Sequence, residues 1–443
     1  MHFVADLHLH SKYSRAVSQS MTLSVMAQYA KQKGIDILTA GDWTHPLWFK
    51  EIQSQLEEAG KGVYKIKEQH SNLKKEVYFL LSTEISCIYK QEDKLRRIHN
   101  LVFVPDLATA DKVSKELVHR GCNLSADGRP IIGLSSKNLY ELVLSINNHA
   151  FLIPCHIWTP HFGVYGSASG FDSLQEAYGE LASYIYAIET GLSSDPDMNW
   201  QIPELKNRSI LSFSDAHSPA KMAREATVFD LEMISFENIR KAIMKKSSEG
   251  NKVAYTIEFY PEEGKYHFSG HRNCKVVQGP KEIAESGNIC PVCHRRLTEG
   301  VLFRVQQLSD EKLLGRAVIK KNEQGLHWFT DKLHEQPPYV KLVPLLEIVA
   351  EGLHSTVASQ KSKDMFAKLC NELDSEITVL LKAQLADIEK IAGQRIAEGV
   401  KKVRSGDIEI NPGYDGEYGK VEIWKEGETN GTKTDSPQLS LDI

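Results

Sequence analysis

The sequence predicts an α/β fold built around a largely parallel sheet. Short apolar runs alternate with segments of helical periodicity through the first half of the chain, which is typical of strand–helix–strand units. The chain has 443 residues, of which 41% are hydrophobic and 25% are charged. This composition is ordinary for a globular protein, and the length allows a sizeable core. About seven strand–helix units are expected, which suits a βα barrel.

The expected strands are short and apolar. They are His2–Asp6, Ile35–Ala40, Val77–Thr83, Ile98–Val104, Ala150–Pro154, Ile185–Ile188 and Ser209–Phe213. Helical periodicity is clearest between them at Leu23–Lys33 and Ser173–Ser183.

The pattern changes along the chain and predicts four regions. Residues 1–245 hold the strand–helix units, and residues 250–335 begin with an expected strand, Val253–Tyr260, and contain a compact Cys/His cluster. Residues 336–425 are mainly helical, with an amphipathic stretch that Gly393 and Gly399 interrupt, so two shorter helices with a turn are expected. Residues 426–443 are polar and expected to be disordered.

Charge and cysteine content exclude several classes of protein. Lys and Arg number 53 against 58 Asp and Glu, a net charge of −5, which excludes a strongly basic coat but not a local basic groove. Seven cysteines are too few for a disulfide scaffold and favour a reducing compartment. No apolar run approaches the ~20 residues that span a bilayer, and the first residues do not resemble a signal peptide. We therefore expect a cytoplasmic protein without a membrane partner.

Acidic and histidine residues follow almost every expected strand. In a parallel barrel the carboxyl ends of the strands meet at one rim, so these side chains should share one pocket. Imidazole and carboxylate ligands suit zinc, manganese or iron, and their number predicts two or three ions. His45, His161 and Glu189 are alternatively partners that orient a ligand. The predicted ligands are His8, His10, Asp42, His45, Glu84, His99, His156, Glu189, Asp215 and His217.

Such a centre predicts phosphoester chemistry. Paired metal ions stabilise both the attacking and the leaving oxygen of a phosphate displacement, and they lower the pKa of bound water. We expect Zn²⁺, with Mg²⁺ or Mn²⁺ as alternatives. His8, His10, Asp42, Glu84, His99, His156, Asp215 and His217 are the predicted catalytic residues.

A second metal pattern lies in residues 250–335. His271 and Cys274 precede Cys290 and Cys293 in an HxxC…CxxC arrangement, and each two-residue gap lets both ligands reach one tetrahedral zinc ion. His267 or His294 is an alternative fourth ligand, and a redox CxxC pair is the weaker alternative. Arg295 and Arg296 beside this motif are candidate phosphate contacts or plain surface charges.

Two features near the end of the chain are candidates for binding. Lys401, Lys402 and Arg404 on an expected helix could contact phosphate, although a plain amphipathic helix explains them equally well. Pro412–Gly419 is a turn-rich loop that resembles a segment of superfamily-one DNA helicases, but no P-loop occurs, which excludes an ATP-driven helicase. The last six residues resemble the peptide that binds the bacterial sliding clamp, with Gln438, Leu439, Leu441 and Ile443 as anchors.

The ordered metal residues resemble those of the polymerase and histidinol phosphatase (PHP) superfamily. The matching motifs are His8-Leu-His10-Ser, Glu84, His99, His156 and Ser214-Asp215-Ala-His217, within residues 1–245. The resemblance implies a distorted seven-stranded βα barrel with a trinuclear metal centre that hydrolyses phosphoesters. One departure is Asp42-Trp43, where members often carry Asp-His, so His45 is a candidate substitute.

The combination of these motifs over nearly the whole chain resembles the endonuclease Q family. That resemblance implies a DNA repair enzyme that cuts damaged DNA on the 5′ side of a deaminated base (uracil, hypoxanthine or xanthine) or an abasic site. Two alternatives remain: a small-molecule phosphoesterase of the histidinol phosphatase type, and a non-catalytic DNA-damage-binding protein. The loop from His161 to Ser173 is a candidate lid or base pocket, or an ordinary surface loop.

Overall fold

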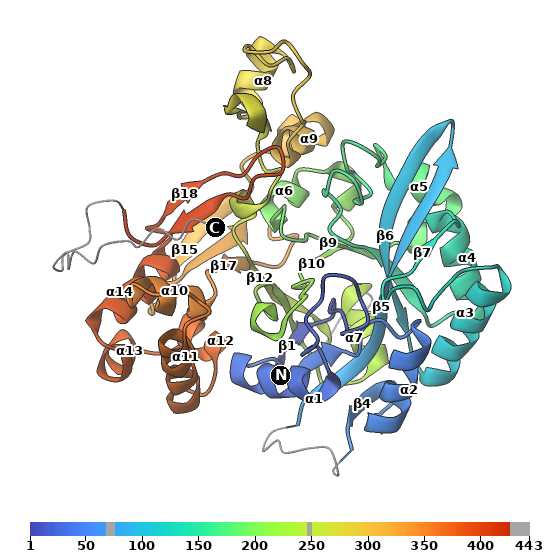
Figure 1. Cartoon of the computed structure of the whole chain (residues 1–443), viewed down its shortest axis with the longest axis horizontal. Helices are drawn as coiled ribbons and strands as arrows, with labels where there is room; N and C mark the ends of the chain where they lie inside the picture. Colours follow the sequence, from blue (N-terminus) through green and yellow to red (C-terminus); the bar gives the residue numbers. More distant parts are fainter. Residues whose placement is uncertain (68–75, 246–249, 426–443) are drawn as a thin grey trace, which may run out of the picture.

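A mixed sheet of 13 strands organises the molecule (Figure 1). The computed structural model describes residues 1–67, 76–245 and 250–425. The sheet runs in the order β15-β16-β17-β12-β11-β1-β2-β5-β4-β3; β6 and β7 join it at β5, and β8 pairs with β6. The strands of this part are β1 (His2–Asp6), β2 (Ile37–Thr39), β3 (Leu56–Gly60), β4 (Val63–Ile66), β5 (Tyr78–Gln91), β6 (Lys94–Val104), β7 (Ile131–Ile132), β8 (Phe151–Pro154), β11 (Ala226–Asp230), β12 (Lys252–Glu258), β15 (Ala317–Lys321), β16 (His327–Asp331) and β17 (Tyr339–Lys341).

Helices connect these strands in the first 245 residues. They are α1 (Leu23–Lys33), α2 (Pro46–Gln55), α3 (Leu107–His119), α4 (Ser136–Ile146), α5 (Leu174–Tyr178), α6 (Pro196–Trp200) and α7 (Phe236–Ile243). The helix expected at Leu23–Lys33 has those bounds, and Gly34 ends it in a left-handed conformation with φ of 87°. The helix expected at Ser173–Ser183 is a short α-helix followed by a 3-10 helix.

The strand directions differ from the largely parallel sheet that the sequence predicts. Strands β1, β2 and β5 are parallel, but β5 and β6 form a long antiparallel hairpin, and β6 pairs antiparallel with β8. The hairpin turns at Glu92 and Asp93, which both have positive φ, as a two-residue turn between twisted strands requires. Alternating apolar residues look the same in a hairpin and in two separate strands, so the pattern alone did not reveal the direction.

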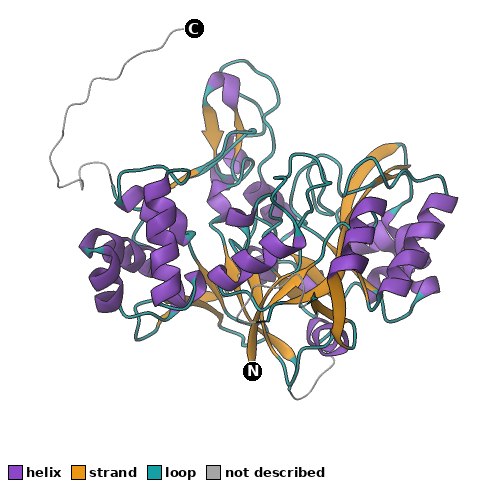
Figure 2. Ribbon diagram, turned by 60° about the horizontal axis from the view of Figure 1, so that its bottom comes forward, coloured by secondary structure: helices purple, strands orange, loops and turns teal. Residues whose placement is uncertain are grey.

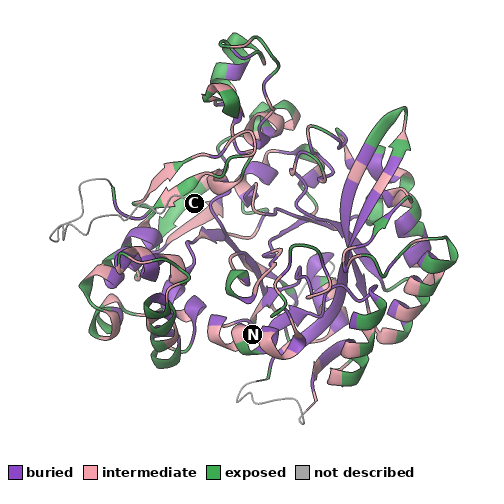
Figure 3. Cartoon of the chain, viewed as in Figure 1, coloured by how far each residue is buried: buried purple, intermediate pink, exposed green. Residues whose placement is uncertain are grey.

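A separate parallel pair brings the chain back to its first strand. Strands β9 (Ala187–Glu189) and β10 (Ser209–Leu211) pair in parallel. Beyond β10, Ala216 forms a parallel bridge with Leu9, just after β1. The ends of β1, β8, β9 and β10 therefore lie near one another. Figure 3 shows that the strands at the centre are buried.

Residues 250–343 are joined to the same sheet and carry a projecting segment. Strand β12 pairs with β11 on one side and with β17 on the other. Between them the chain forms β13 (Ser269–His271), β14 (Val276–Gln278), α8 (Pro280–Ser286) and α9 (Val301–Leu308). The segment around α8 stands out from the body at the top of Figure 1.

The C-terminal helices form a second group on the opposite side of the strands from α3 and α4 (Figure 2). They are α10 (Leu345–Gly352), α11 (Gln360–Glu372), α12 (Glu376–Leu381), α13 (Leu385–Ala392) and α14 (Gln394–Ser405), followed by the hairpin β18 (Glu409–Asn411) and β19 (Lys420–Glu422). Gly393, with φ of 87°, separates α13 from α14 as expected. Gly399 does not interrupt α14, and its missing side chain makes room for Trp424 and Ile348 against the helix.

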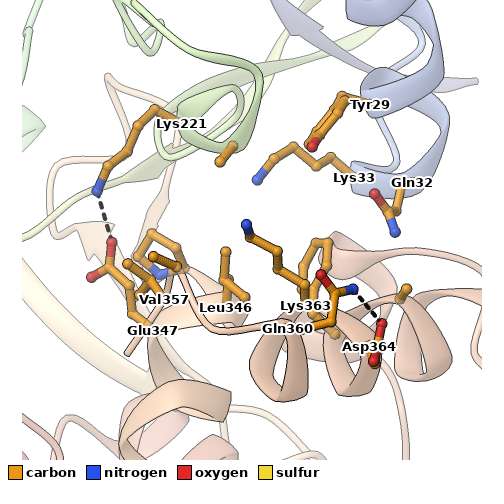
Figure 4. Close-up of a pocket in the computed structure, with 15 residues that line it drawn as sticks. Tyr29, Gln32, Lys33, Lys221, Leu346, Glu347, Val357, Gln360, Lys363 and Asp364 are labelled. Atoms are coloured by element: carbon orange, nitrogen blue, oxygen red, sulfur yellow. Dashed lines mark hydrogen bonds and ion pairs between the residues drawn. The ribbon is translucent and has the colours of Figure 1, made fainter. Parts of the chain in front are cut away.

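These helices pack against α1 through a buried ion pair. Lys33 Nζ lies 2.6 Å from Glu376 Oε2, and both side chains are almost fully buried. Beside it a cavity of about 460 Å³ lies between α1, Lys221 and α11 (Figure 4). No helix in the described parts of the chain has both the length and the apolar character that crossing a membrane requires.

Candidate metal centres

The first predicted pair, His8 and His10, follows β1 on either side of Leu9, which bridges to Ala216, and residues two apart in an extended segment share a side. His8 Nδ1 lies 2.8 Å from Glu189 Oε1, which leaves Nε2 as the free ring nitrogen. That Nε2 is buried without a hydrogen-bond partner in the described structure. It lies 3.8 Å from Glu84 Oε2 and 3.7 Å from Asp215 Oδ1.

His10 lies between three carboxylates. Its Nδ1 is 3.1 Å from Asp42 Oδ1, and its Nε2 is 3.1 Å from Asp215 Oδ1 and 3.3 Å from Glu84 Oε2. Asp42 Oδ2 also accepts a hydrogen bond from Ser14 Oγ at 2.8 Å, which fixes the carboxylate.

Glu84 also contacts His99 and His156. Glu84 lies inside β5 rather than at a strand end, and His99 of β6 is opposite Ser86, so Glu84 and His99 are diagonal neighbours on one face of the hairpin. His156 Nε2 is 3.0 Å from Glu84 Oε1 and 3.2 Å from His99 Nδ1, and His99 Nδ1 contacts the same Glu84 oxygen.

The potential ligand atoms form four overlapping groups, each within 4.8 Å of one another. Glu84 belongs to two groups, so its two oxygens face different sets of histidines. The groups are His8, His10 and Glu84; His8, Cys155 and Glu189; His10, Asp215 and His217; and Glu84, His99 and His156.

This donor set fits metal ions. Burial lowers the pKa of His8, but the carboxylates of Glu189 and Asp215 outweigh it and raise that pKa well above its usual range. Burial raises the pKa of Glu84, while His99 and Arg129 lower it well below its usual range. The negative charge of the buried carboxylates is therefore stabilised by the cations around them. Nε2 of His8, which has no hydrogen-bond partner in the described structure, would offer its lone pair to a metal ion.

Three of the predicted ligands have a left-handed backbone. The φ angles are 37° at Asp42, 33° at His156 and 47° at Asp215. Each residue follows a strand, where the chain turns sharply at the rim. Non-glycine residues in this region carry strain, which concentrates at functional sites.

Of the three residues that could instead orient a ligand, His45 and His161 lie outside the four groups, whereas Glu189 belongs to one of them. His45 precedes α2 and stacks on Tyr13 with ring centroids 4.5 Å apart, outside the four groups. His161 lies edge-on to Tyr266 at 6.2 Å, also outside them. Glu189 receives both His8 Nδ1 and the backbone N–H of His156, each at 2.8 Å, so it holds two residues of the centre in place.

His271, Cys274, Cys290 and Cys293 converge in the projecting segment. Cys293 Sγ lies 3.2 Å from His271 Nδ1. Burial raises the pKa of Cys290, but hydrogen bonds from the backbone of Cys293 and the side chain of His271 lower it to about 6. A thiol with such a pKa is a ready metal ligand. His267 and His294 are not part of this group.

The predicted basic contacts divide into exposed and buried residues. Arg295, Arg296 and Lys401 are exposed. Lys402 is buried, with Nζ 3.1 Å from Asp407 Oδ2, and Arg404 is buried and donates to the backbone oxygens of Leu380 and Val379. In this structure the charges of Lys402 and Arg404 are therefore engaged inside the protein, whereas Lys401 is open to solvent. Helical spacing places basic residues on a face without saying which face packs inward.

Residue-by-residue reading of the sequence missed Arg129 and Cys155. Arg129 Nη1 lies 3.2 Å from Glu84 Oε2, and Cys155 joins a group with His8 and Glu189. Cys155 directly precedes His156 at a strand end, which was a usable signal, whereas Arg129 lies in a loop that no pattern marks. The residues of the proposed clamp-binding peptide, 438–443, lie outside the described residues.

Comparison with known proteins gives relatives over most of the chain. Residues 344–407 match the family model of the MJ0043 C-terminal domain. The protein YqxK of Bacillus subtilis is 29% identical over 432 residues, covering 94% of this chain and 98% of that protein. The protein MJ0043 of Methanocaldococcus jannaschii is 31% identical over 271 residues, and the chain spans only 31% of its length.

Two solved structures match over almost the full length. The crystal structure of a lesion-specific endonuclease from Pyrococcus furiosus is 29% identical, with a TM-score of 0.78 and 96% of each chain covered. A crystal structure of endonuclease Q with a 27-mer duplex substrate, carrying an abasic lesion at the active site, is 30% identical, with a TM-score of 0.79. It covers 96% of this chain and 97% of that chain. With this identity over nearly the whole of both chains, the chain belongs to the endonuclease Q family.

Proposed function

We propose that this chain is a metal-dependent DNA repair endonuclease that hydrolyses the phosphodiester on the 5′ side of a deaminated base or an abasic site. The observation that carries this proposal is the set of overlapping ligand groups around Glu84 at the wall of an open cavity. The endonuclease Q relative in complex with abasic DNA supports DNA as the substrate.

The centre would hold two or three ions through its four overlapping groups, two of which share Glu84. Bound ions supply Lewis acidity, which lowers the pKa of water and offsets the charge of a phosphodiester. The chain's own residues supply the positioning: Asp42 orients His10, and Glu189 fixes both His8 and the backbone of His156. Zinc, manganese and magnesium are the candidate ions, and zinc suits the Cys₃His group of the projecting segment.

The cavity beside the centre has room for an extruded nucleotide. Its volume is about 450 Å³, and its wall includes His99, His156, Phe162 and Ile131. Phe162 belongs to the loop from His161 to Ser173 and lies 4.5 Å from the His99 ring, so it offers an aromatic surface for a flipped base. A damaged base leaves its duplex more easily than a paired one, which gives selectivity.

The proposed organisation assigns one role to each region. Residues 1–245 form the PHP-type hydrolase, residues 250–335 the zinc-binding part, and residues 336–425 a helical part that contacts DNA. The loop between residues 156 and 172 ties the first two together, because Arg304 donates to Tyr165 O at 3.1 Å and to Phe171 O at 3.1 Å. Arg295, Arg296 and Lys401 remain the candidate phosphate contacts, and the protein would act in the cytoplasm.

The decisive experiment uses labelled duplexes that carry one uracil, hypoxanthine, xanthine or abasic site. The protein is incubated with each duplex and with Mn²⁺, Mg²⁺ or Zn²⁺, and an Asp215→Asn variant is the control. We expect one nick 5′ to the lesion, with 3′-hydroxyl and 5′-phosphate ends, from the unchanged protein only. Turnover of histidinol phosphate without nicking would favour a small-molecule phosphoesterase, and lesion binding without any hydrolysis would favour a damage-binding protein.

We also propose that the last six residues bind the DNA sliding clamp. Deletion of residues 438–443 should abolish clamp binding and leave nicking in the absence of clamp unchanged. Clamp binding retained by the shortened chain would contradict this role.

A further inference from the structure

Two arginines line the cavity beside the metal centre. The wall of this cavity includes Asp215, His156 and His99 from the centre, together with Arg15 and Arg129. Both arginines carry a positive charge and offer no lone pair to a metal ion. An anion that approaches ions in the centre through this cavity would therefore pass both arginines.

Arg129 is held beside the carboxylate at the middle of the centre. Its Nη1 lies 3.2 Å from Glu84 Oε2, and its side chain is 24% exposed. A guanidinium group has five N–H donors in a rigid plane, and Glu84 engages one of its nitrogens. The remaining donors are available to the cavity that the residue lines.

The loop that carries Arg129 packs closely against the metal centre. Gly128 N donates to Tyr13 O at 3.1 Å. A Cβ atom on Gly128 would lie 2.3 Å from Ser14 Oγ and 2.4 Å from Asp42 Oδ2, so no other residue fits without displacing Asp42. Glycine therefore lets the backbone approach Asp42, and this approach brings the next residue over Glu84.

Asp127 in the same loop holds both arginines. Its Oδ1 accepts the backbone N–H groups of Arg15 and Arg129, each at 3.2 Å. Its Oδ2 lies 3.5 Å from Arg15 Nε, although the Arg15 side chain is 77% exposed. The backbone positions of the two arginines are thus fixed relative to each other, while Arg15 keeps a free outer surface.

We propose that Arg129, with Arg15 at its outer side, forms a binding site for the scissile phosphate of the substrate. A planar guanidinium recognises phosphate oxygens in a bidentate manner that the point charge of lysine does not reproduce. Arg129 would hold a phosphate oxygen while its contact with Glu84 fixes its orientation. This inference rests on the proposed function, because it names the group that the same site binds.

The test compares Arg129→Gln, Arg129→Lys and Arg15→Gln with the unchanged protein. Arg120→Gln is the matched control, since Arg120 follows α3 and its Nε lies 3.1 Å from Glu116 Oε1. Binding of inorganic phosphate to the metal-loaded proteins is measured by calorimetry, bound metal by mass spectrometry, and KM and kcat with the abasic duplex by nicking.

We expect Arg129→Gln to weaken phosphate binding by about 10- to 100-fold, the range for a lost hydrogen bond to a charged group. Arg129→Lys should recover only part of the loss, Arg15→Gln should have a smaller effect, and Arg120→Gln none. Metal content should be equal in all proteins. Unchanged phosphate binding in Arg129→Gln, or loss of metal ions from it, would overturn the proposal.

The two proposals fail in distinguishable ways. If no duplex is nicked but phosphate binding falls in Arg129→Gln, the phosphate site stands and the endonuclease proposal fails. If duplexes are nicked and Arg129→Gln binds phosphate like the unchanged protein, the endonuclease proposal stands and the phosphate site is wrong.

Discussion

Replacement of Glu189 by glutamine tests how the centre holds its ligands. Glu189 is fully buried and accepts two hydrogen bonds of 2.8 Å, one from His8 Nδ1 and one from the backbone N–H of His156. A carboxylate has two oxygens for these two donors, whereas a glutamine amide has one oxygen and one NH₂ group. One donor therefore loses its acceptor or meets another donor.

The expected magnitude follows from this loss. A buried donor without an acceptor costs about 1–3 kcal/mol. Replacement of a residue that orients a metal-bound histidine typically lowers metal affinity or activity by about 10- to 100-fold. We therefore expect Glu189→Gln to bind fewer ions at limiting metal and to recover most of its activity at high metal concentration.

The assay is a metal titration of the chelator-treated protein, with bound metal and nicking measured on the same samples. Glu180→Gln is the control, because the Glu180 side chain is 70% exposed and its carboxylate pairs with Lys137, away from the centre. Glu84→Gln is the reference for a residue that faces two ligand groups, and its nicking activity should not recover at high metal concentration. Metal affinity of Glu189→Gln equal to that of the unchanged protein would refute the reasoning, and so would a loss as complete as that of Glu84→Gln.

Three further changes have expected outcomes. Cys290→Ser should release zinc from the projecting segment and lower the nicking rate, because that segment has only a small apolar cluster and depends on its metal. Zinc content and near-UV circular dichroism check this expectation, and retained zinc would contradict it. Glu376→Ala should destabilise the chain by about 3–5 kcal/mol in urea unfolding, because it leaves the buried Lys33 unpaired, whereas Glu372→Ala on the surface should not. Gly191→Ala should lower the nicking rate by a larger factor than it lowers the folding equilibrium constant. The reason is that its Cβ would lie 2.3 Å from His156 Cβ, at a position with φ of 60°. Full activity with unchanged kinetics would contradict this.

The sequence located most of the strands and the residues that converge, because both depend on local patterns. A strand that enters a buried sheet is apolar until it reaches the rim, and the next polar residue marks its end, as for Asp6 and His8. The positions of Asp42, His156 and Asp215 followed from this rule. Glu84 did not obey it, because β5 continues for seven more residues beyond it.

Features that depend on tertiary packing could not be found in this way. The directions of β5 and β6 depend on a turn at Glu92 and Asp93, which is not among the usual glycine-containing signals. The burial of Lys402 depends on how α14 packs, and the place of Arg129 depends on the contact between Gly128 and Asp42. A single glycine in a polar loop gives no indication of what its missing side chain accommodates.

The strained backbone at the rim connects the fold to the chemistry. Asp42, His156 and Asp215 each adopt a left-handed conformation that glycine would adopt without a steric penalty, and such a conformation costs a non-glycine residue on the order of 1–3 kcal/mol. Glycine there would relieve the strain but would remove an imidazole or carboxylate from the centre. His156 and Asp215 each supply an atom to one of the ligand groups, and Asp42 contacts His10 of two such groups, so the sharp turns bring side chains from three strand ends toward one centre. The fold therefore tolerates backbone strain at the positions where a ligand atom is needed. Cations bound by these groups would stabilise the buried carboxylates, and this gain in free energy would offset the cost of the strain.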